Sequence, residues 1–215
     1  MNDLLQMKRL VPGGTCPVMV SKIPKDIFGE IKEWVRVCRK YKDHPLADLR
    51  AHENVGYKNQ KDVGEKIKHN TYQCSVPASL VDQSFWLGWI LRLAAKYYGG
   101  GTAYHRDFFI RDLKGHFDRY DLWVNFAYKG DDNPLHNHAG FLSGVIYVQN
   151  DRHPTIFPEY NTLYNGEDGT MVLFPSTTMH FVDNKTTSKE RVTLAFNLER
   201  LETPGHDKEL WLVKS

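Results

Sequence analysis

Three histidines of the 215-residue chain stand at positions from which their side chains could bind one metal ion. His136 and His138 are two residues apart, shortly before the apolar and β-branched run Leu142–Val148. In an extended segment, residues two apart point to the same face, so both imidazoles can approach one ion. His180 ends a later run that begins at Gly169, and the strands of a barrel or sandwich bring such distant segments together. Neutral imidazoles that leave coordination positions open suit Fe(II), Zn(II) or Cu(II).

An arginine and a threonine follow this candidate metal site in the chain. Arg191 begins the run RVTLAFN, and Thr193 lies two residues later on the same face of the expected strand. An arginine on a strand offers a planar pair of donors that fits a carboxylate. Metal and arginine together suit a chelating dicarboxylic acid, with one end on the metal and the far carboxylate on Arg191 and Thr193.

The pair of histidines is a weak signal by itself, because a chain with ten histidines forms some His-x-His pairs by chance. The third histidine after a strand, and the Arg-x-Thr strand beyond it, make metal binding the favoured interpretation. The other histidines lack such a setting and are expected to be ordinary surface or core residues: His44, His52, His69, His105, His116, His153 and His206.

The elements that must position these residues change character along the chain. The apolar run at 16–23 predicts a strand, and helical spacing of apolar residues predicts helices over 27–38 and 77–98. The polar residues 41–75 predict a long loop or a set of short elements, either facing a substrate or forming a solvated surface. From residue 121 onward, short β-branched and aromatic runs alternate with turns. Helices followed by many short strands indicate an α+β chain whose second half is a sandwich or barrel.

One of these runs, residues 122–127, alternates strictly between two faces. Leu122, Val124 and Phe126 are expected on one face of the strand, and the residues between them on the other.

Taken in order, the motifs resemble a known superfamily. Asn133-x-x-His136-x-His138, LSGVIYV, GTMVLFPSTTMHFV and ERVTLAFN are similar to the Fe(II)- and 2-oxoglutarate-dependent oxygenases. The pattern is nearest to a bacterial and phage group with H-x-H…SGVYY…FPS…H…RxS/T. The resemblance spans residues 123–197, about a third of the chain, and is weaker in the helices before it.

The resemblance implies an α+β fold with a double-stranded β-helix core, also called a jelly roll or cupin-like core, and N-terminal supporting helices. It implies Fe(II) on His136 and His180, and the far carboxylate of 2-oxoglutarate on Arg191 and Thr193. Two further residues are expected to contact this cosubstrate on the same grounds: Tyr147 and Asn125.

The second histidine of the pair departs from the family, in which an aspartate or glutamate usually stands where this chain has His138. Two interpretations stay open: a three-histidine centre, or a site in which His138 turns away and water or another group completes the coordination. The nearby carboxylates Asp131, Asp132 and Asp183 could in principle substitute, although none occupies the expected strand position.

The reaction implied by the resemblance is hydroxylation of a substrate by molecular oxygen, with conversion of 2-oxoglutarate to succinate and CO2. The substrate is expected to be a peptide or a small molecule. Two alternatives remain: a cupin-like three-histidine dioxygenase that does not use 2-oxoglutarate, and a non-catalytic jelly-roll binding module. Replacing Arg191 with alanine should abolish 2-oxoglutarate binding in the oxygenase, whereas it should matter little to iron binding in the cupin-like enzyme. Succinate release would exclude the non-catalytic module.

Composition excludes several other classes of protein. With 28 Lys and Arg against 26 Asp and Glu, the net charge of +2 argues against a dedicated nucleic-acid binder. No apolar window is long enough for a membrane helix, and the first residues do not form a secretory signal. Three widely spaced cysteines, Cys16, Cys38 and Cys74, fit a reducing compartment. We therefore expect a cytoplasmic protein (in the host cytoplasm, if the chain is of phage origin) without a membrane partner.

The length suggests a single domain over residues 1–215. Within it we expect a mixed, mainly helical support region at 1–120, the jelly-roll core at 121–200 and a C-terminal tail at 201–215. A homodimer is compatible with such a chain, although no self-complementary face is evident in the sequence.

Overall fold

A computed structural model describes residues 17–42, 71–98, 107–110, 120–183 and 185–201 of the chain. Most of the loop expected at 41–75 and nearly all of the tail expected at 201–215 lie outside these residues. Six of the histidines set aside above also lie outside them: His44, His52, His69, His105, His116 and His206.

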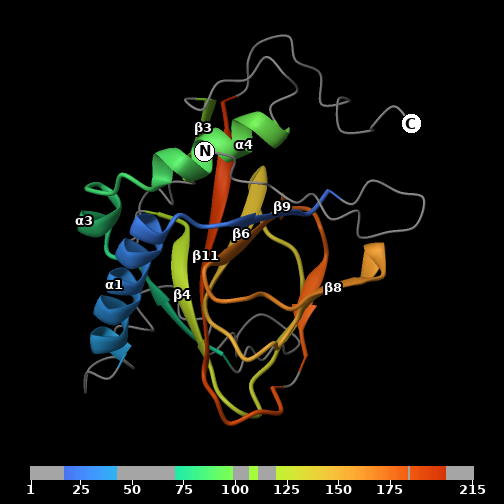
Figure 1. The fold of residues 1–215 in the computed structure, drawn as a ribbon. Helices are drawn as coiled ribbons and strands as arrows, with labels where there is room; N and C mark the ends of the chain where they lie inside the picture. The colour runs from blue at the N-terminus through green and yellow to red at the C-terminus, as the bar shows by residue number, and fades with distance from the viewer. Residues whose placement is uncertain (1–16, 43–70, 99–106, 111–119, 184, 202–215) are drawn as a thin grey trace, which may run out of the picture.

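The described residues form two sheets. The larger one is antiparallel and has the strand order β1-β9-β6-β11-β4-β2, with β3 also paired to β11 (Figure 1). Strands from the first half of the chain therefore join those of the second half in one sheet. Its strands are β1 (Met19–Lys22), β2 (Tyr72–Ser75), β3 (Phe108–Ile110), β4 (Leu122–Ala127), β6 (Leu142–Gln149), β9 (Thr170–Pro175) and β11 (Arg191–Arg200).

The smaller sheet is also antiparallel and has the order β5-β10-β7-β8. Its strands are β5 (Asn133–His136), β7 (Thr155–Phe157), β8 (Thr162–Tyr164) and β10 (His180–Val182), with the short 3-10 helix η3 (Pro158–Tyr160) between β7 and β8.

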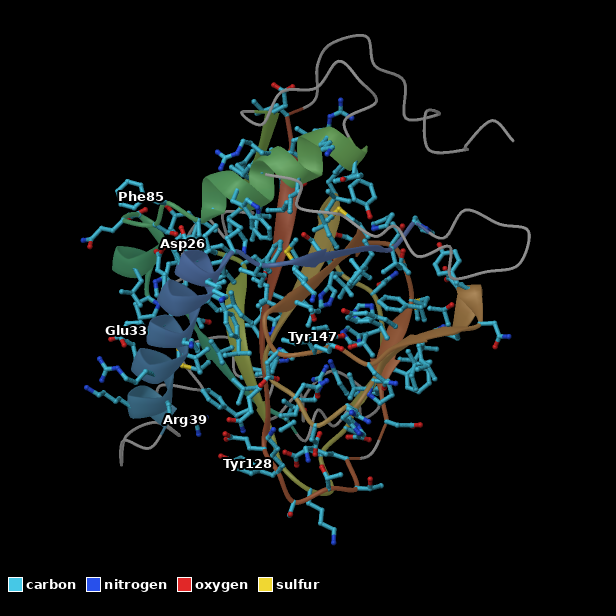
Figure 2. The ribbon with its side chains drawn as sticks, viewed as in Figure 1. Asp26, Glu33, Arg39, Phe85, Tyr128 and Tyr147 are labelled. Atoms are coloured by element: carbon cyan, nitrogen blue, oxygen red, sulfur yellow. The ribbon has the colours of Figure 1, made fainter. Side chains whose placement is uncertain are left out.

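The two sheets face each other. The rings of Phe157 and Phe174, one from each sheet, are 5.1 Å apart, and the hydroxyl of Tyr147 lies 2.7 Å from that of Thr155. Figure 2 shows Tyr147 inside the molecule. Two antiparallel sheets packed face to face agree with the expected jelly-roll core.

Within the described ranges, three helices precede the strands of the second half: α1 (Lys25–Lys42), α3 (Ala78–Val81) and α4 (Leu87–Tyr98). Helix α1 contacts β2 and β6, and α4 contacts β3 (Figure 1). None of the helices in the described part of the chain is long and apolar enough to cross a membrane.

The prediction of one helix over 77–98 was wrong, because the chain turns between α3 and α4. The turn carries Asp82 and Ser84, whose short polar side chains favour turns over helix interiors. It directs Trp86 into the core, where its ring lies 5.0 Å from that of Trp34 on α1. The adjacent Phe85 is 91% exposed and projects from the surface in Figure 2.

The outer face of the larger sheet forms the main hydrophobic core with the helices. Val124, Phe126 and Leu194 from the sheet belong to the same buried cluster as Ile31 and Ile90 from α1 and α4. The residues that alternate with them point to the smaller sheet instead. The predicted alternation of residues 122–127 is thus confirmed, since Trp123, Asn125 and Ala127 line a pocket between the sheets.

Candidate functional site

The three histidines singled out in the sequence lie together in the lining of this pocket. Candidate ligand atoms of His136, His138 and His180 all lie within 4.8 Å of one another. Their ring centroids are 4.3 to 5.1 Å apart. In the described part of the chain they form the one cluster of three or more potential metal ligands.

Strand pairing explains how this convergence arises. His136 ends β5 and His180 begins β10, and the two residues are direct partners in the smaller sheet. Directly opposed residues of antiparallel strands place their side chains on the same face. The backbone N–H of His138 donates to the carbonyl of Ser176 at 2.9 Å, in the turn before β10. This bond holds the third imidazole beside the other two.

Hydrogen bonds to backbone carbonyls set the tautomers of two of the imidazoles. Nδ1 of His136 lies 2.6 Å from the carbonyl oxygen of Pro134, and Nδ1 of His180 lies 3.0 Å from that of Thr178. A carbonyl can only accept, so Nδ1 carries the proton in both rings. Nε2 is then left with its lone pair, as a metal ligand requires.

The electrostatic surroundings keep His180 neutral. Its side chain is 3% exposed, and burial together with the neighbouring His136 lowers its pKa to about 3. The hydrogen bond to Thr178 opposes this shift. An imidazole without a proton on Nε2 at neutral pH is ready to bind a metal ion.

Arg191 lies in the same pocket, at the start of β11. It is 5% exposed, its Nη2 donates to the hydroxyl of Thr155 at 3.2 Å, and its guanidinium lies 5.5 Å from the centroid of the Tyr147 ring. Burial lowers its pKa, and Tyr147 and Asp151 oppose that shift. The Nε–H of Arg191 is buried without a hydrogen-bond partner among the described residues. A buried arginine with an unused donor is suited to an anionic ligand.

Asn125 and Thr193 lie side by side on the pocket wall, because β4 and β11 pair at these two positions. The amide nitrogen of Asn125 donates to the Thr193 hydroxyl at 3.2 Å, and its amide oxygen accepts from the indole of Trp123 at 3.1 Å. These contacts fix both side chains at the pocket surface, as expected for residues that position a ligand.

Tyr147 takes a different place from the other predicted contacts. It is fully buried and pairs with Thr193 in the sheet, but it does not line the pocket. Its hydroxyl is 2.7 Å from that of Thr155, which does line the pocket and also accepts from Arg191. In this structure Tyr147 therefore reaches the pocket through Thr155 and through its ring, which lies beside the Arg191 guanidinium.

Among the pocket residues that the sequence did not indicate are three polar ones: His153, Thr155 and Lys185. His153 was set aside with the ordinary histidines, yet it is 9% exposed, and its Nε2 lies 2.7 Å from the carbonyl oxygen of Asp183. The two-residue spacing of His153 and Thr155 was a usable signal, since such residues share a face of an extended chain. Nothing in the sequence around Lys185 indicates its burial.

The carboxylates considered as substitute ligands do not join the histidine cluster. Asp131 and Asp132 line the pocket, and the carboxylate of Asp131 accepts the backbone N–H of Tyr128 at 2.7 Å. Burial raises the pKa of Asp131. The backbone carbonyl of Asp183 accepts the His153 ring N–H described above. The donor set that the fold assembles thus consists of imidazoles.

The sequence matches no protein-family model and no curated protein, so comparison depends on solved structures. The viral collagen prolyl hydroxylase vCPH from Paramecium bursaria Chlorella virus-1, in a complex with 2OG, superposes with a TM-score of 0.54 at 11% identity, over 87% of this chain and 97% of that one. A truncated form of the same hydroxylase gives 0.53 at 12% identity, over 94% and 99%. This chain shares the fold of that hydroxylase. A prolyl-4-hydroxylase from Pseudomonas putida has a TM-score of 0.48 at 15% identity, over 87% and 95% of the two chains.

Proposed function

We propose that this protein is an Fe(II)- and 2-oxoglutarate-dependent oxygenase that hydroxylates a peptide or small-molecule substrate and releases succinate and CO2. The observation that carries the proposal is one pocket lined by three clustered imidazoles and by a buried arginine with an unused donor. The fold shared with a viral collagen prolyl hydroxylase supports it.

The donor set fits a divalent iron ion. Nε2 of His136 and Nε2 of His180 carry the lone pairs that would bind the ion, and His138 would supply the third imidazole. A metal held by three protein ligands keeps positions open for a chelating acid and for oxygen. Bound there, iron and 2-oxoglutarate would supply the oxidising power for the hydroxylation, which the side chains of this chain cannot supply themselves.

The other pocket residues would bind and orient the cosubstrate. Arg191 would pair with its far carboxylate, and the hydroxyl of Thr193, next to Asn125, would accept or donate one further hydrogen bond. Trp123, Val145 and Ala195 would cover the carbon chain and exclude water from it. Tyr147 would keep the arginine in position, through Thr155 and through its ring beside the guanidinium.

The test of this function is the oxygen-dependent release of succinate from 2-oxoglutarate, measured with purified protein and added Fe(II). We expect turnover in the wild type and a loss of about a hundredfold or more in Arg191→Ala, because a charge-assisted pair to the far carboxylate is removed. Arg36→Ala is the matched control, since Arg36 is an exposed arginine of α1 that pairs with Glu33. A wild type without turnover, or with turnover equal to that of Arg191→Ala, would contradict the proposal.

A second candidate follows from the all-histidine donor set, which is also that of cupin-like dioxygenases that do not use 2-oxoglutarate. Under that function, Arg191→Ala leaves oxygen chemistry at the metal intact. Loss of oxygen consumption in Arg191→Ala would therefore exclude the cupin-like function. Succinate release would exclude a non-catalytic binding module.

For the organisation of the chain we keep the proposal of one domain over residues 1–215. Strands β1, β2 and β3, which come from the first 120 residues, belong to the same sheet as the later strands. This sheet supports a single unit because neither half could complete it alone.

A further inference from the structure

A buried ion pair lies at the arginine end of the pocket. Nζ of Lys185 is 3.2 Å from Oδ2 of Asp151, and the two side chains are 0% and 11% exposed. The ammonium group also donates to the carbonyl of Thr187 at 2.7 Å and to the hydroxyl of the same residue. These three acceptors account for the three N–H bonds of the lysine. Lys185 therefore has no donor left for a ligand, although it lines the pocket.

The second carboxylate oxygen of Asp151 does not form a hydrogen bond with Arg191. Oδ1 of Asp151 and Nε of Arg191 are both buried, and neither has a hydrogen-bond partner among the described residues. The two groups belong to the same buried region, because Asp151 is bound to Lys185, which lines the pocket together with Arg191. The charge of Asp151 also opposes the effect of burial on the pKa of Arg191. An unsatisfied buried acceptor and an unsatisfied buried donor of opposite charge favour a direct bond unless something holds them apart.

The bond to Lys185 is what holds the carboxylate. With Asp151 bound to the lysine, this group of two cations and one carboxylate keeps one positive charge uncompensated, on Arg191. An aspartate released from Lys185 would gain most by accepting from the guanidinium, and a ligand carboxylate would then have to displace it.

We propose that Lys185 keeps Arg191 available to an anionic ligand by holding Asp151, the buried carboxylate that would otherwise neutralise the arginine. The inference rests on the proposed function for the identity of the ligand, a dicarboxylic 2-oxo acid. Lys185 and Asp151 are positioning residues, because they act on the ligand through Arg191.

The first test is calorimetric binding of 2-oxoglutarate to protein loaded with Fe(II) without oxygen. Lys185→Met frees Asp151 and is expected to weaken binding about tenfold or more. The double variant Lys185→Met/Asp151→Asn removes the competing carboxylate and is expected to bind within about threefold of the wild type. Lys189→Met, at an exposed lysine of the same segment, is the matched control and should bind as the wild type does.

Binding of 2-oxohexanoate, which has about the same length and an uncharged end, separates this effect from general damage to the pocket. Its affinity is expected to stay the same in all the variants, so only the preference for the diacid changes. A double variant that binds 2-oxoglutarate as weakly as Lys185→Met would overturn the inference, because a merely structural role gives no rescue.

A second measurement needs no ligand and so separates this inference from the proposed function. The Nε–H resonance of Arg191, assigned by its loss in Arg191→Lys, is followed in ¹H–¹⁵N spectra. We expect it to move downfield and exchange more slowly in Lys185→Met, where Asp151 becomes its acceptor, and to return in the double variant.

An unchanged resonance in Lys185→Met would overturn the inference even if 2-oxoglutarate binds. A wild type that binds no 2-oxoglutarate would contradict the proposed function, and the resonance would still decide the role of Lys185.

Discussion

At the scale of single residues, the most informative feature is the third histidine of the cluster. His138 stands where a carboxylate would give the metal site one negative charge, and its backbone is tied to Ser176 beside His180. Under the proposed function, Fe(II) held by neutral ligands would take its charge compensation from the acid that chelates it. That function therefore predicts strongly coupled binding of metal and cosubstrate.

Replacing His138 tests whether it is a ligand. His138→Ala is expected to weaken Fe(II) affinity about tenfold or more, and His138→Asp to restore it, because a carboxylate can take the same coordination position. Bound iron is measured after anaerobic equilibrium dialysis. His153→Ala is the control, since His153 lines the same pocket outside the cluster and should not alter iron binding. Unchanged iron affinity in His138→Ala would show that His138 is not a ligand.

The buried His180 predicts how the stability of the metal-free protein depends on pH. Its pKa is about 3 in the folded state, below its ordinary value of 6.5, so between these values the unfolded state binds more protons. The free energy of unfolding should therefore fall as the pH drops from about 6.5 towards 3, with a contribution of at most ~1.4 kcal/mol per pH unit. Urea unfolding across this range measures the slope. His180→Asn should lack this contribution, and an equal slope in both proteins would contradict the assignment.

At the scale of elements, a phenyl ring of β11 packs directly over a glycine of β6. A Cβ added to Gly144 would lie 2.1 Å from Cζ of Phe196, which is fully buried. The two residues are partners across the strands, and the ring covers the glycine. The central strands of the larger sheet thus depend on one position without a side chain.

Gly144→Ala is accordingly expected to lower the free energy of unfolding by about 1–3 kcal/mol, because Phe196 must move within a filled core. Gly29→Ala provides a control with the opposite sign. Gly29 is an exposed residue inside α1 with nothing near its Cβ position, so alanine there should stabilise by about 0.5–1 kcal/mol. Chemical unfolding of both variants measures the difference, and a destabilisation of equal size in both would contradict the packing argument.

The elements also show what could be predicted from the sequence. The two-residue spacing of His136 and His138 and the alternation along β4 follow from strand geometry alone, so both were predictable. The turn at 82–86 was not, because it depends on where Trp86 meets Trp34 across the core. The roles of Lys185 and Asp151 depend on a contact across 34 positions of the chain, which no local pattern records.

At the scale of the whole molecule, the two sheets supply different parts of the pocket. The outer face of the larger sheet is apolar and packs against the helices, whereas its inner face carries the polar residues that line the pocket. The smaller sheet contributes two of the histidines, and the larger sheet contributes the arginine. The histidine end and the arginine end of the pocket therefore belong to different sheets, and only the folded core brings them together in one pocket.

The central claim is that one acid bridges these two ends, and calorimetric titration of 2-oxoglutarate under anaerobic conditions tests it most directly. The titration is made with and without Fe(II), on the wild type, Arg191→Ala and His180→Ala. We predict binding to the wild type that requires Fe(II) and is lost in both variants, because each removes the anchor of one end. Absence of binding to the iron-loaded wild type, or binding that survives in Arg191→Ala, would contradict the account.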